Sequence, residues 1–189
     1  MHKQTSLRQA DPFVFQADSG ILSGRGRGEE LLKELTEYLR RTEPDAVTPL
    51  DFSEIQFMDI SSADECVTKL LMRIGSGELG TRYVYLTGAN ESIRETVEAV
   101  MKLRGLATLH KSDDGVQILG TLKTPIREAL EVMLDLKSAT SSEISKALNK
   151  NVNIACNRLN ALQRMGLVCR LKDESVEGGG RQFVYEAIA

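Results

Sequence analysis

The chain has 189 residues, of which 41% are hydrophobic and 27% are charged, with 24 basic residues against 27 acidic ones. This composition is typical of a globular protein and excludes an intrinsically disordered chain, and the length allows one or two domains. No apolar run approaches the roughly 18 residues of a membrane-spanning helix, and the first residues lack the features of a signal peptide, so we expect a cytoplasmic protein with no membrane contact.

The first 120 residues alternate short β-type runs with amphipathic helices. The β-type runs occupy residues 13–15, 47–52, 55–58 and 82–87, and a hairpin is predicted from residues 106–110 and 116–119. We expect residues 55–58 to continue the strand of residues 47–52 after a bend. Between them lie three helices: four leucines between Leu31 and Leu39 share one face of the first, and apolar residues recur at helical spacing from Ala63 to Ile74 and from Ile93 to Met101. Strands interleaved with helices predict an α/β layer with a small mixed sheet.

The pattern changes after Gly120. Thr124 and Pro125 have the character of a helix N-cap and first residue, Thr140 and Glu143 have capping-box spacing, and a third helix is predicted over residues 152–165. Two strands follow, at residues 168–173 and 181–188, joined by a glycine-rich loop. Three helices and a hairpin predict a small α+β domain of the winged helix-turn-helix class over residues 121–189.

The two parts also differ in charge. Residues 1–120 carry 14 basic and 19 acidic residues, a net charge of −5, whereas residues 121–189 carry 10 and 8, a net charge of +2. Such an asymmetry is one indication that the second part meets a polyanion.

The third predicted helix of the second part carries a polar stripe. At about 100° per residue, one side is polar and the opposite side is apolar. The polar side holds Asn153, Asn157, Asn160 and Arg164, and the apolar side holds Val152, Ala155, Leu159 and Leu162. Asparagine can pair bidentately with adenine in the major groove, and arginine reaches guanine or a phosphate.

This stripe predicts an interface with double-stranded DNA. We expect base-edge contacts from the first half of the helix and phosphate contacts from its end and from the hairpin. The first group is Asn153, Ile154, Asn157 and Arg158, and the second is Arg164, Lys172 and Arg181. The alternatives are a merely solvated helix face and a protein-docking module, because this part of the chain is poor in positive charge.

The second part resembles the winged helices of MarR- and ArsR-type bacterial regulators. The resemblance covers about 65 residues and is carried by residues 141–148 and by the run LNALQRMGLV at residues 159–168. It implies that the third helix is the DNA reader.

Residues 12–120 resemble the STAS domain of anti-sigma factor antagonists. The resemblance is carried by residues 50–62, LDFSEIQFMDISS, which run into an amphipathic helix. It implies a switch or partner-docking turn at Asp59, Ser61 and Ser62, in which phosphorylation of a serine by a kinase-like ATPase expels a partner. The sequence departs from that pattern at Ile60 and at residues 63–65. Residues 23–28, SGRGRG, and the Ser-Ala-Asp-Glu turn at residues 62–65 resemble more closely a STAS-like family of unknown function. Members of that family are often found beside helix-turn-helix domains in bacteria.

Each of these residues also has a structural interpretation. Ser62 and Glu65 have capping-box spacing and predict the start of a helix, and acids such as Asp51 and Asp59 commonly hydrogen-bond turns. Arg25 and Arg27 alternate with glycines before a helix and are candidate anion-binding residues, although a flexible helix entry explains the same pattern. His110 lacks metal-ligating neighbours, and we interpret it as structural.

No nucleophile–base arrangement, metal cluster or cofactor loop stands out, so we expect neither an enzyme nor a cofactor. Instead the sequence predicts a transcriptional regulator, in which the winged helix binds DNA, as a homodimer, and the STAS-like domain senses a partner protein or signal. The alternative is a partner-switching adaptor in which both domains dock proteins and DNA is not touched.

Overall fold

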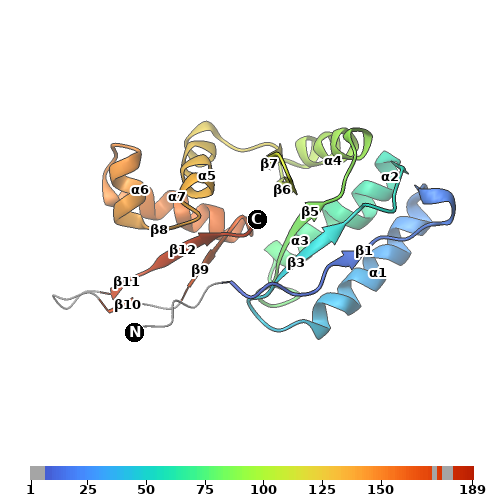
Figure 1. Cartoon of the computed structure of the whole chain (residues 1–189), viewed down its shortest axis with the longest axis horizontal. Helices are drawn as coiled ribbons and strands as arrows, with labels where there is room; N and C mark the ends of the chain where they lie inside the picture. Colours follow the sequence, from blue (N-terminus) through green and yellow to red (C-terminus); the bar gives the residue numbers. More distant parts are fainter. Residues whose placement is uncertain (1–6, 172–173, 176–180) are drawn as a thin grey trace. The chain divides into compact units, whose positions relative to one another are not determined.

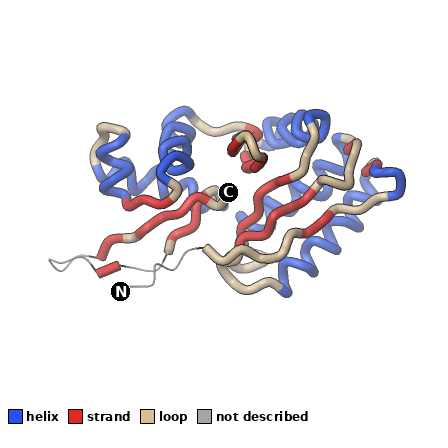
Figure 2. The backbone as a smooth tube through the Cα atoms, in the orientation of Figure 1, coloured by secondary structure: helices blue, strands red, loops and turns tan. Residues whose placement is uncertain are grey.

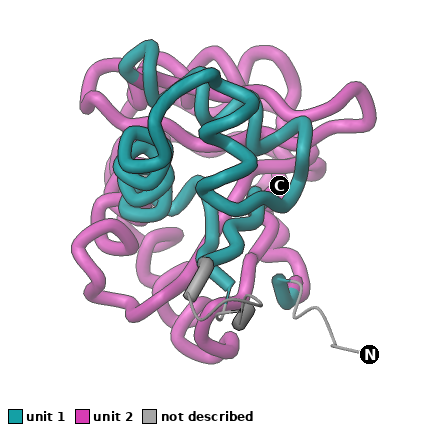
Figure 3. The backbone as a smooth tube through the Cα atoms, turned by 90° about the vertical axis from the view of Figure 1, so that its left-hand side faces the viewer, with its two compact units in different colours: residues 1–8, 123–188 teal, residues 9–122, 189 magenta. Residues whose placement is uncertain are grey.

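The structure, a computed structural model, describes residues 7–171, 174–175 and 181–189, and of residues 174, 175, 181 and 182 it describes the backbone alone. The chain forms two compact units, coloured separately in Figure 3. The N-terminal unit comprises residues 9–122, and the C-terminal unit comprises residues 123–188 together with Leu7 and Arg8. Leu7 belongs there because its amide donates to the Glu186 carboxylate at 3.2 Å.

The N-terminal unit is built on a mixed sheet of five strands in the order β1-β3-β5-β6-β7 (Figures 1 and 2). The strands are β1 (Phe13–Val14), β3 (Val47–Asp51), β5 (Tyr83–Thr87), β6 (Ala107–Ser112) and β7 (Gly115–Gly120). Neighbours from β1 to β6 are parallel, and β6 and β7 form an antiparallel hairpin with Leu109 opposite Ile118. This mixed α/β architecture agrees with the class predicted from the sequence.

Helices pack against one face of this sheet. They are α1 (Arg25–Arg41), the continuous run α2 (Ile60–Ala63), η2 (Asp64–Thr68) and α3 (Lys69–Gly75), and α4 (Glu91–Arg104). The predicted apolar faces are buried: Leu35 and Leu39 of α1, Cys66 and Leu70 of the second run, and Val97 of α4 join one core with Leu50 and Leu86 of the sheet. Each fully buried leucine contributes roughly 1.5–3 kcal/mol to this core.

Two features of this unit differ from the prediction. Residues 57–58 form β4 (Phe57–Met58), which does not continue the main strand but pairs in parallel with β2 (Ile21–Leu22), just after the short helix η1 (Asp18–Gly20). The turn at residues 52–55 leads the chain out of the main sheet. The second helix contains the π-helical segment η2 in its middle, a local widening that apolar spacing does not reveal.

Gly28 explains part of the glycine-rich helix start. A Cβ at this position would lie 2.7 Å from Cβ of Glu65 and 3.0 Å from the Ser62 carbonyl oxygen. The missing side chain therefore lets α1 pack closely against α2 and η2. Gly24, with φ of +84°, turns the chain into α1, whereas a Cβ at Gly26 would meet nothing within 4 Å. The pattern of glycines thus has a structural reason at residues 24 and 28.

The C-terminal unit combines three helices with a three-stranded antiparallel sheet. The helices are α5 (Thr124–Leu136), α6 (Ser141–Ala147) and α7 (Val152–Arg164). The sheet has the order β8-β12-β9, with β8 (Ser138–Thr140), β9 (Val168–Arg170) and β12 (Val184–Ala187). Beyond β9, β10 (Glu174–Ser175) pairs with β11 (Arg181–Gln182). The core is formed by Leu130, Met133, Ile144, Leu159 and Leu162, each 0% exposed.

Strand β8 was not predicted, because three residues between two helices carry too short a pattern to detect. The start of α5 also differs by one residue: Lys123, not Thr124, is the N-cap, so Pro125 is the second helical residue. Among the residues that the structure describes, no helix combines the length and the apolar content that crossing a membrane requires.

Candidate functional site

Local hydrogen bonds fix the start of α6 and the turn between α6 and α7. The Thr140 hydroxyl accepts from the Glu143 amide at 3.3 Å, and the Glu143 carboxylate accepts from the Thr140 amide at 2.7 Å, which confirms the predicted capping box. These bonds lower the pKa of Glu143, the one from the Thr140 amide most of all. After α6, Asn149 adopts a positive φ of 50°, and Asn151 caps α7 by accepting from the Asn153 amide at 2.8 Å. The start of α7 is thus held in one orientation.

The solvent-facing side of α7 gathers four of the predicted DNA-binding residues. Ala155, Leu159 and Leu162 are buried on the opposite side, as predicted, and this fixes the rotation of the helix. The exposed residues are Asn153, Ile154, Asn157 and Arg164. We call these four residues the α7 face.

Two other residues of α7 do not lie where the helical periodicity placed them. Val152 was assigned to the apolar side but is 44% exposed, because it is the first helical residue and precedes the turn that packs on the core. Asn160 was assigned to the polar stripe but is half-buried and accepts from the Tyr185 hydroxyl of β12 at 3.2 Å.

Arg158 is also held away from the α7 face. Its Nη1 donates to the Glu128 carboxylate of α5 at 3.1 Å, and its side chain is 12% exposed. The guanidinium therefore ties α7 to α5, and this structure does not present Arg158 with the exposed residues of the helix as the sequence analysis expected.

The predicted contacts from the hairpin cannot be placed. Lys172 lies outside the described residues, and the structure describes only the backbone of Arg181, which belongs to β11. Two exposed basic residues that the sequence analysis missed are Lys146, on α6, and Lys150, in the turn before α7. Their signal was present in the sequence as two lysines flanking the turn between consecutive helices.

In the N-terminal unit, Asp59 joins the starts of two helices. Its Oδ1 accepts from the Ser62 amide at 2.7 Å as the N-cap of α2, and its Oδ2 accepts from the Gly24 amide at 2.8 Å and the Ser23 hydroxyl at 2.7 Å at the start of α1. Burial by itself raises the pKa of this carboxyl, but the hydrogen bonds from Ser62, Ser23 and Gly24 outweigh it and lower the pKa to about 2. The Asp59 carboxylate therefore holds the starts of α1 and α2 together. It lies in the turn for which the sequence analysis predicted a switch.

The capping prediction for Ser62 is wrong. The helix begins one turn earlier, with Asp59 as its cap, and Ser62 is 0% exposed. The Ser62 hydroxyl lies 2.9 Å from the Leu22 carbonyl oxygen and 2.8 Å from Oδ1 of Asp59, so it links β2 to this helix start. A buried and bonded hydroxyl is not accessible to a kinase, whereas Ser61 is only half-buried.

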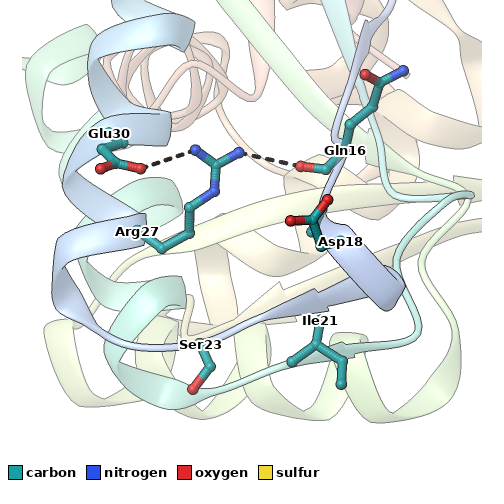
Figure 4. Close-up of a pocket in the computed structure, with 7 residues that line it drawn as sticks. Gln16, Asp18, Ile21, Ser23, Arg27 and Glu30 are labelled. Atoms are coloured by element: carbon teal, nitrogen blue, oxygen red, sulfur yellow. Dashed lines mark hydrogen bonds and ion pairs between the residues drawn. The ribbon is translucent and has the colours of Figure 1, made fainter.

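Arg25 and Arg27 are already paired with carboxylates. Nη1 of Arg27 donates to Glu30 at 3.1 Å, and Nη2 donates to the Gln16 carbonyl oxygen at 3.2 Å (Figure 4). Nη1 also donates to Glu34 at 3.3 Å. The shallow pocket beside Arg27 is also lined by Asp18 and Glu30, which disfavour an anion there. Arg25 lies 4.0 Å from the buried carboxylate of Glu65, which also pairs with Lys69. The structure therefore does not bring these arginines together as an anion site.

An exposed apolar surface lies next to the Asp59 turn. Ile21 and Phe57 are register partners across β2 and β4, and they are 50% and 46% exposed, while their neighbours Leu22 and Met58 are buried. Ile60, the first residue of α2, is 59% exposed. We call Ile21, Phe57 and Ile60 the outer apolar surface. The sequence does not predict the outer apolar surface, because two-residue strands are too short for alternation to show which side chains are exposed.

Compared with known proteins, the chain matches no protein-family model, and no curated protein is significantly similar to it. Within the described parts of the chain, no three His, Cys, Asp or Glu side chains gather as metal ligands. His110 is buried in β6, where burial and, to a smaller extent, Arg94 lower its pKa.

Proposed function

We propose that this protein is a DNA-binding regulator whose C-terminal unit places α7 in the major groove of double-stranded DNA. The observation that carries the proposal is the α7 face, where the amide groups of Asn153 and Asn157 are presented to solvent on a helix whose start and rotation are fixed. Amide side chains can donate and accept hydrogen bonds at once, as the major-groove edge of adenine requires.

The surroundings of the α7 face support the same proposal. Arg164 lies at the C-terminal end of the face, and Lys146 and Lys150 lie on the helix and turn that precede it, all three exposed. Cations at these places are suited to phosphates on either side of the groove, while the amides meet the bases. The order of three helices and a hairpin, together with the resemblance to MarR- and ArsR-type regulators, supports a winged helix-turn-helix. Because a single recognition helix gives limited affinity, the regulator acts as a homodimer on a two-fold site.

In the same proposal the N-terminal unit is a STAS-like domain that binds a regulatory protein, and the chain has no catalytic activity. The outer apolar surface is the docking site, since three large apolar side chains beside a helix start are typical of an interaction surface rather than of a solvated one. Ser61, at its edge, is the remaining candidate for phosphorylation by a kinase-like ATPase. A phosphate there would place about two negative charges next to the Asp59 carboxylate.

Fluorescence anisotropy with a labelled random-sequence duplex at low salt tests the DNA proposal. The full-length chain is expected to bind the duplex, and Asn157→Asp is expected to weaken binding at least tenfold, because it brings a carboxylate toward the negative groove. Gln117→Glu is the matched control, because it makes the same change from amide to carboxylate at an exposed position of β7 in the N-terminal unit. Equal affinities of the two variants, or no binding by the wild type, would contradict the proposal.

The second candidate function is a protein-docking adaptor that never touches DNA. The outer apolar surface favours it, together with the acidic balance of the whole chain, with 27 acidic against 24 basic residues. In that case Ile60→Ser is expected to abolish capture of a protein partner from the source cell. Neither the wild type nor Asn157→Asp is expected to retain duplex DNA.

A further inference from the structure

The first turn of α7 presents two large apolar side chains to solvent. Val152 is 44% exposed and Ile154 is 43% exposed, although the same helix buries Ala155, Leu159 and Leu162 completely. At about 100° per residue, Val152 and Ile154 lie on either side of Asn153. Val152 is exposed because it begins the helix, whereas Ile154 lies on the solvent-facing side near the asparagines. Both apolar side chains are therefore open to a partner that meets the start of α7.

The chemistry of this turn is complementary to one kind of base pair. In the major groove, the thymine C5-methyl group is the apolar feature of a base edge, and adenine offers N7 as an acceptor and its N6 amino group as a donor. Apolar side chains contact the thymine methyl group, and asparagine pairs with N7 and N6 of adenine. Both groups belong to the A·T pair.

We infer that the N-terminal half of α7 recognises A·T base pairs, with Val152 and Ile154 packing on thymine methyl groups and Asn153 and Asn157 pairing with adenine. This inference rests on the proposed DNA-binding function and adds the identity of the bases and the two apolar residues that select them.

The first two turns of α7 also lack side chains that select G·C pairs. Guanine is recognised best by arginine or lysine, and cytosine by a carboxylate. Arg158, the basic residue of these turns, is paired with Glu128 of α5, and residues 152–158 contain no acid. The exposed Arg164 lies at the far end of the helix, where a phosphate is the nearer partner.

The test uses modified bases in a duplex obtained by selection with the full-length chain from random sequences. In one copy of the selected duplex every thymine is replaced by deoxyuridine, which removes the methyl group and keeps all hydrogen-bonding groups. Wild type is expected to bind this copy about fourfold more weakly for each methyl group that it buries. In a second copy adenine is replaced by 7-deazaadenine, which removes the N7 acceptor and is expected to weaken wild-type binding about tenfold.

Variants assign these effects to residues. The double variant Val152→Ala with Ile154→Ala is expected to bind the thymine and uracil duplexes with equal affinity, and Asn157→Ala is expected to lose sensitivity to 7-deazaadenine at one position. Met165→Ala is the matched control, because Met165 is 47% exposed at the opposite end of α7 and is expected to keep both effects.

Two results would overturn the inference while leaving DNA binding intact: equal wild-type affinity for the thymine and uracil duplexes, or a selected sequence composed of G·C pairs alone. Failure to retain any duplex during selection would overturn the inference together with the proposed function, and would point instead to a protein as the partner of this helix.

Discussion

Replacing Asp59 with asparagine is expected to destabilise the N-terminal unit. Asparagine is as good an N-cap as aspartate, so the bond from the Ser62 amide to Oδ1 is kept. The negative charge is lost, and so is the second acceptor, because the amide NH2 cannot accept from Gly24 and Ser23. That charge accepts hydrogen bonds from Ser62, Gly24 and Ser23 at 2.7–2.8 Å. The difference between the ordinary pKa of 3.8 and the value of about 2 in the folded chain corresponds to about 2.4 kcal/mol in favour of the ionised form. Solvent screening of this partly exposed carboxylate reduces the expected loss to roughly 1–1.5 kcal/mol.

The effect should depend on pH in a definite direction. Because the pKa of Asp59 is lower in the folded chain than in the unfolded chain, its contribution is complete above about pH 5 and is lost as the pH falls from about 4 toward 2. Urea unfolding of the full-length chain, followed by circular dichroism and tyrosine fluorescence between pH 7 and pH 2.5, measures it. Three of the four tyrosines, Tyr38, Tyr83 and Tyr85, lie in the N-terminal unit and report on it.

Asp114→Asn is the control for this measurement, because Asp114 is exposed in the turn between β6 and β7, where asparagine fits as well. Asp59→Asn should be less stable than this control at pH 7, and the difference should shrink toward pH 2.5. Equal stability of both variants at pH 7, or a difference that does not change with pH, would refute the assignment of Asp59 as the anion that joins α1 to α2.

Further predictions concern packing, capping and the charges of α7. Gly28→Ala should lower the free energy of unfolding by about 2 kcal/mol in urea titrations, because the new Cβ would lie 2.7 Å from Cβ of Glu65. The control Gly26→Ala, in the same helix, should be neutral or should stabilise the chain by about 0.5 kcal/mol. Thr140→Ala should cost about 1 kcal/mol in the thermal unfolding of the C-terminal unit, since it removes the acceptor for the Glu143 amide; an unchanged midpoint would show that the capping box is dispensable. Arg164→Gln should reduce the slope of log K against log salt for duplex binding by about one. Arg158→Gln should leave this slope unchanged and should cost less than about 1 kcal/mol of stability. The opposite result for the two slopes would place Arg158, not Arg164, at the phosphates.

The helices of the chain could be predicted because their apolar spacing is long enough to define a face. The leucines of α1 and the capping box of Thr140 and Glu143 follow from local patterns that packing then uses unchanged. By contrast, β2 and β8 have two and three residues, so no alternation marks them. The predicted β-type run at residues 55–58 contains β4, but a run of that length does not show that β4 pairs with β2. The π-helical segment η2 depends on how the helix is packed, which spacing alone does not contain.

The candidate site was predicted less completely, for a related reason. Periodicity gives the angle of each side chain about α7 but not the neighbours that it meets. Asn160 was assigned to the polar stripe by angle, and Arg158 was expected at a base edge because it lies in the first half of the helix. Each instead finds a partner on another element, Glu128 of α5 for Arg158 and Tyr185 of β12 for Asn160. Asp59 and Ser62 illustrate the same limit, because both residues have the spacing of a helix cap. The structure shows that Asp59 is the cap of α2 and that its carboxylate also accepts from the start of α1, a contact that local spacing does not contain.

Selection from random duplexes with the full-length chain, read by sequencing and repeated with Asn157→Ala, tests the central claim most directly. If α7 reads bases from the major groove, the wild type should enrich a defined sequence, and Asn157→Ala should lose its preference at one position, at a cost of about 1–3 kcal/mol on the selected site and little on other sequences. Failure of the wild type to enrich any sequence or to retain duplex DNA at low salt would contradict the claim that the α7 face is a DNA-binding surface.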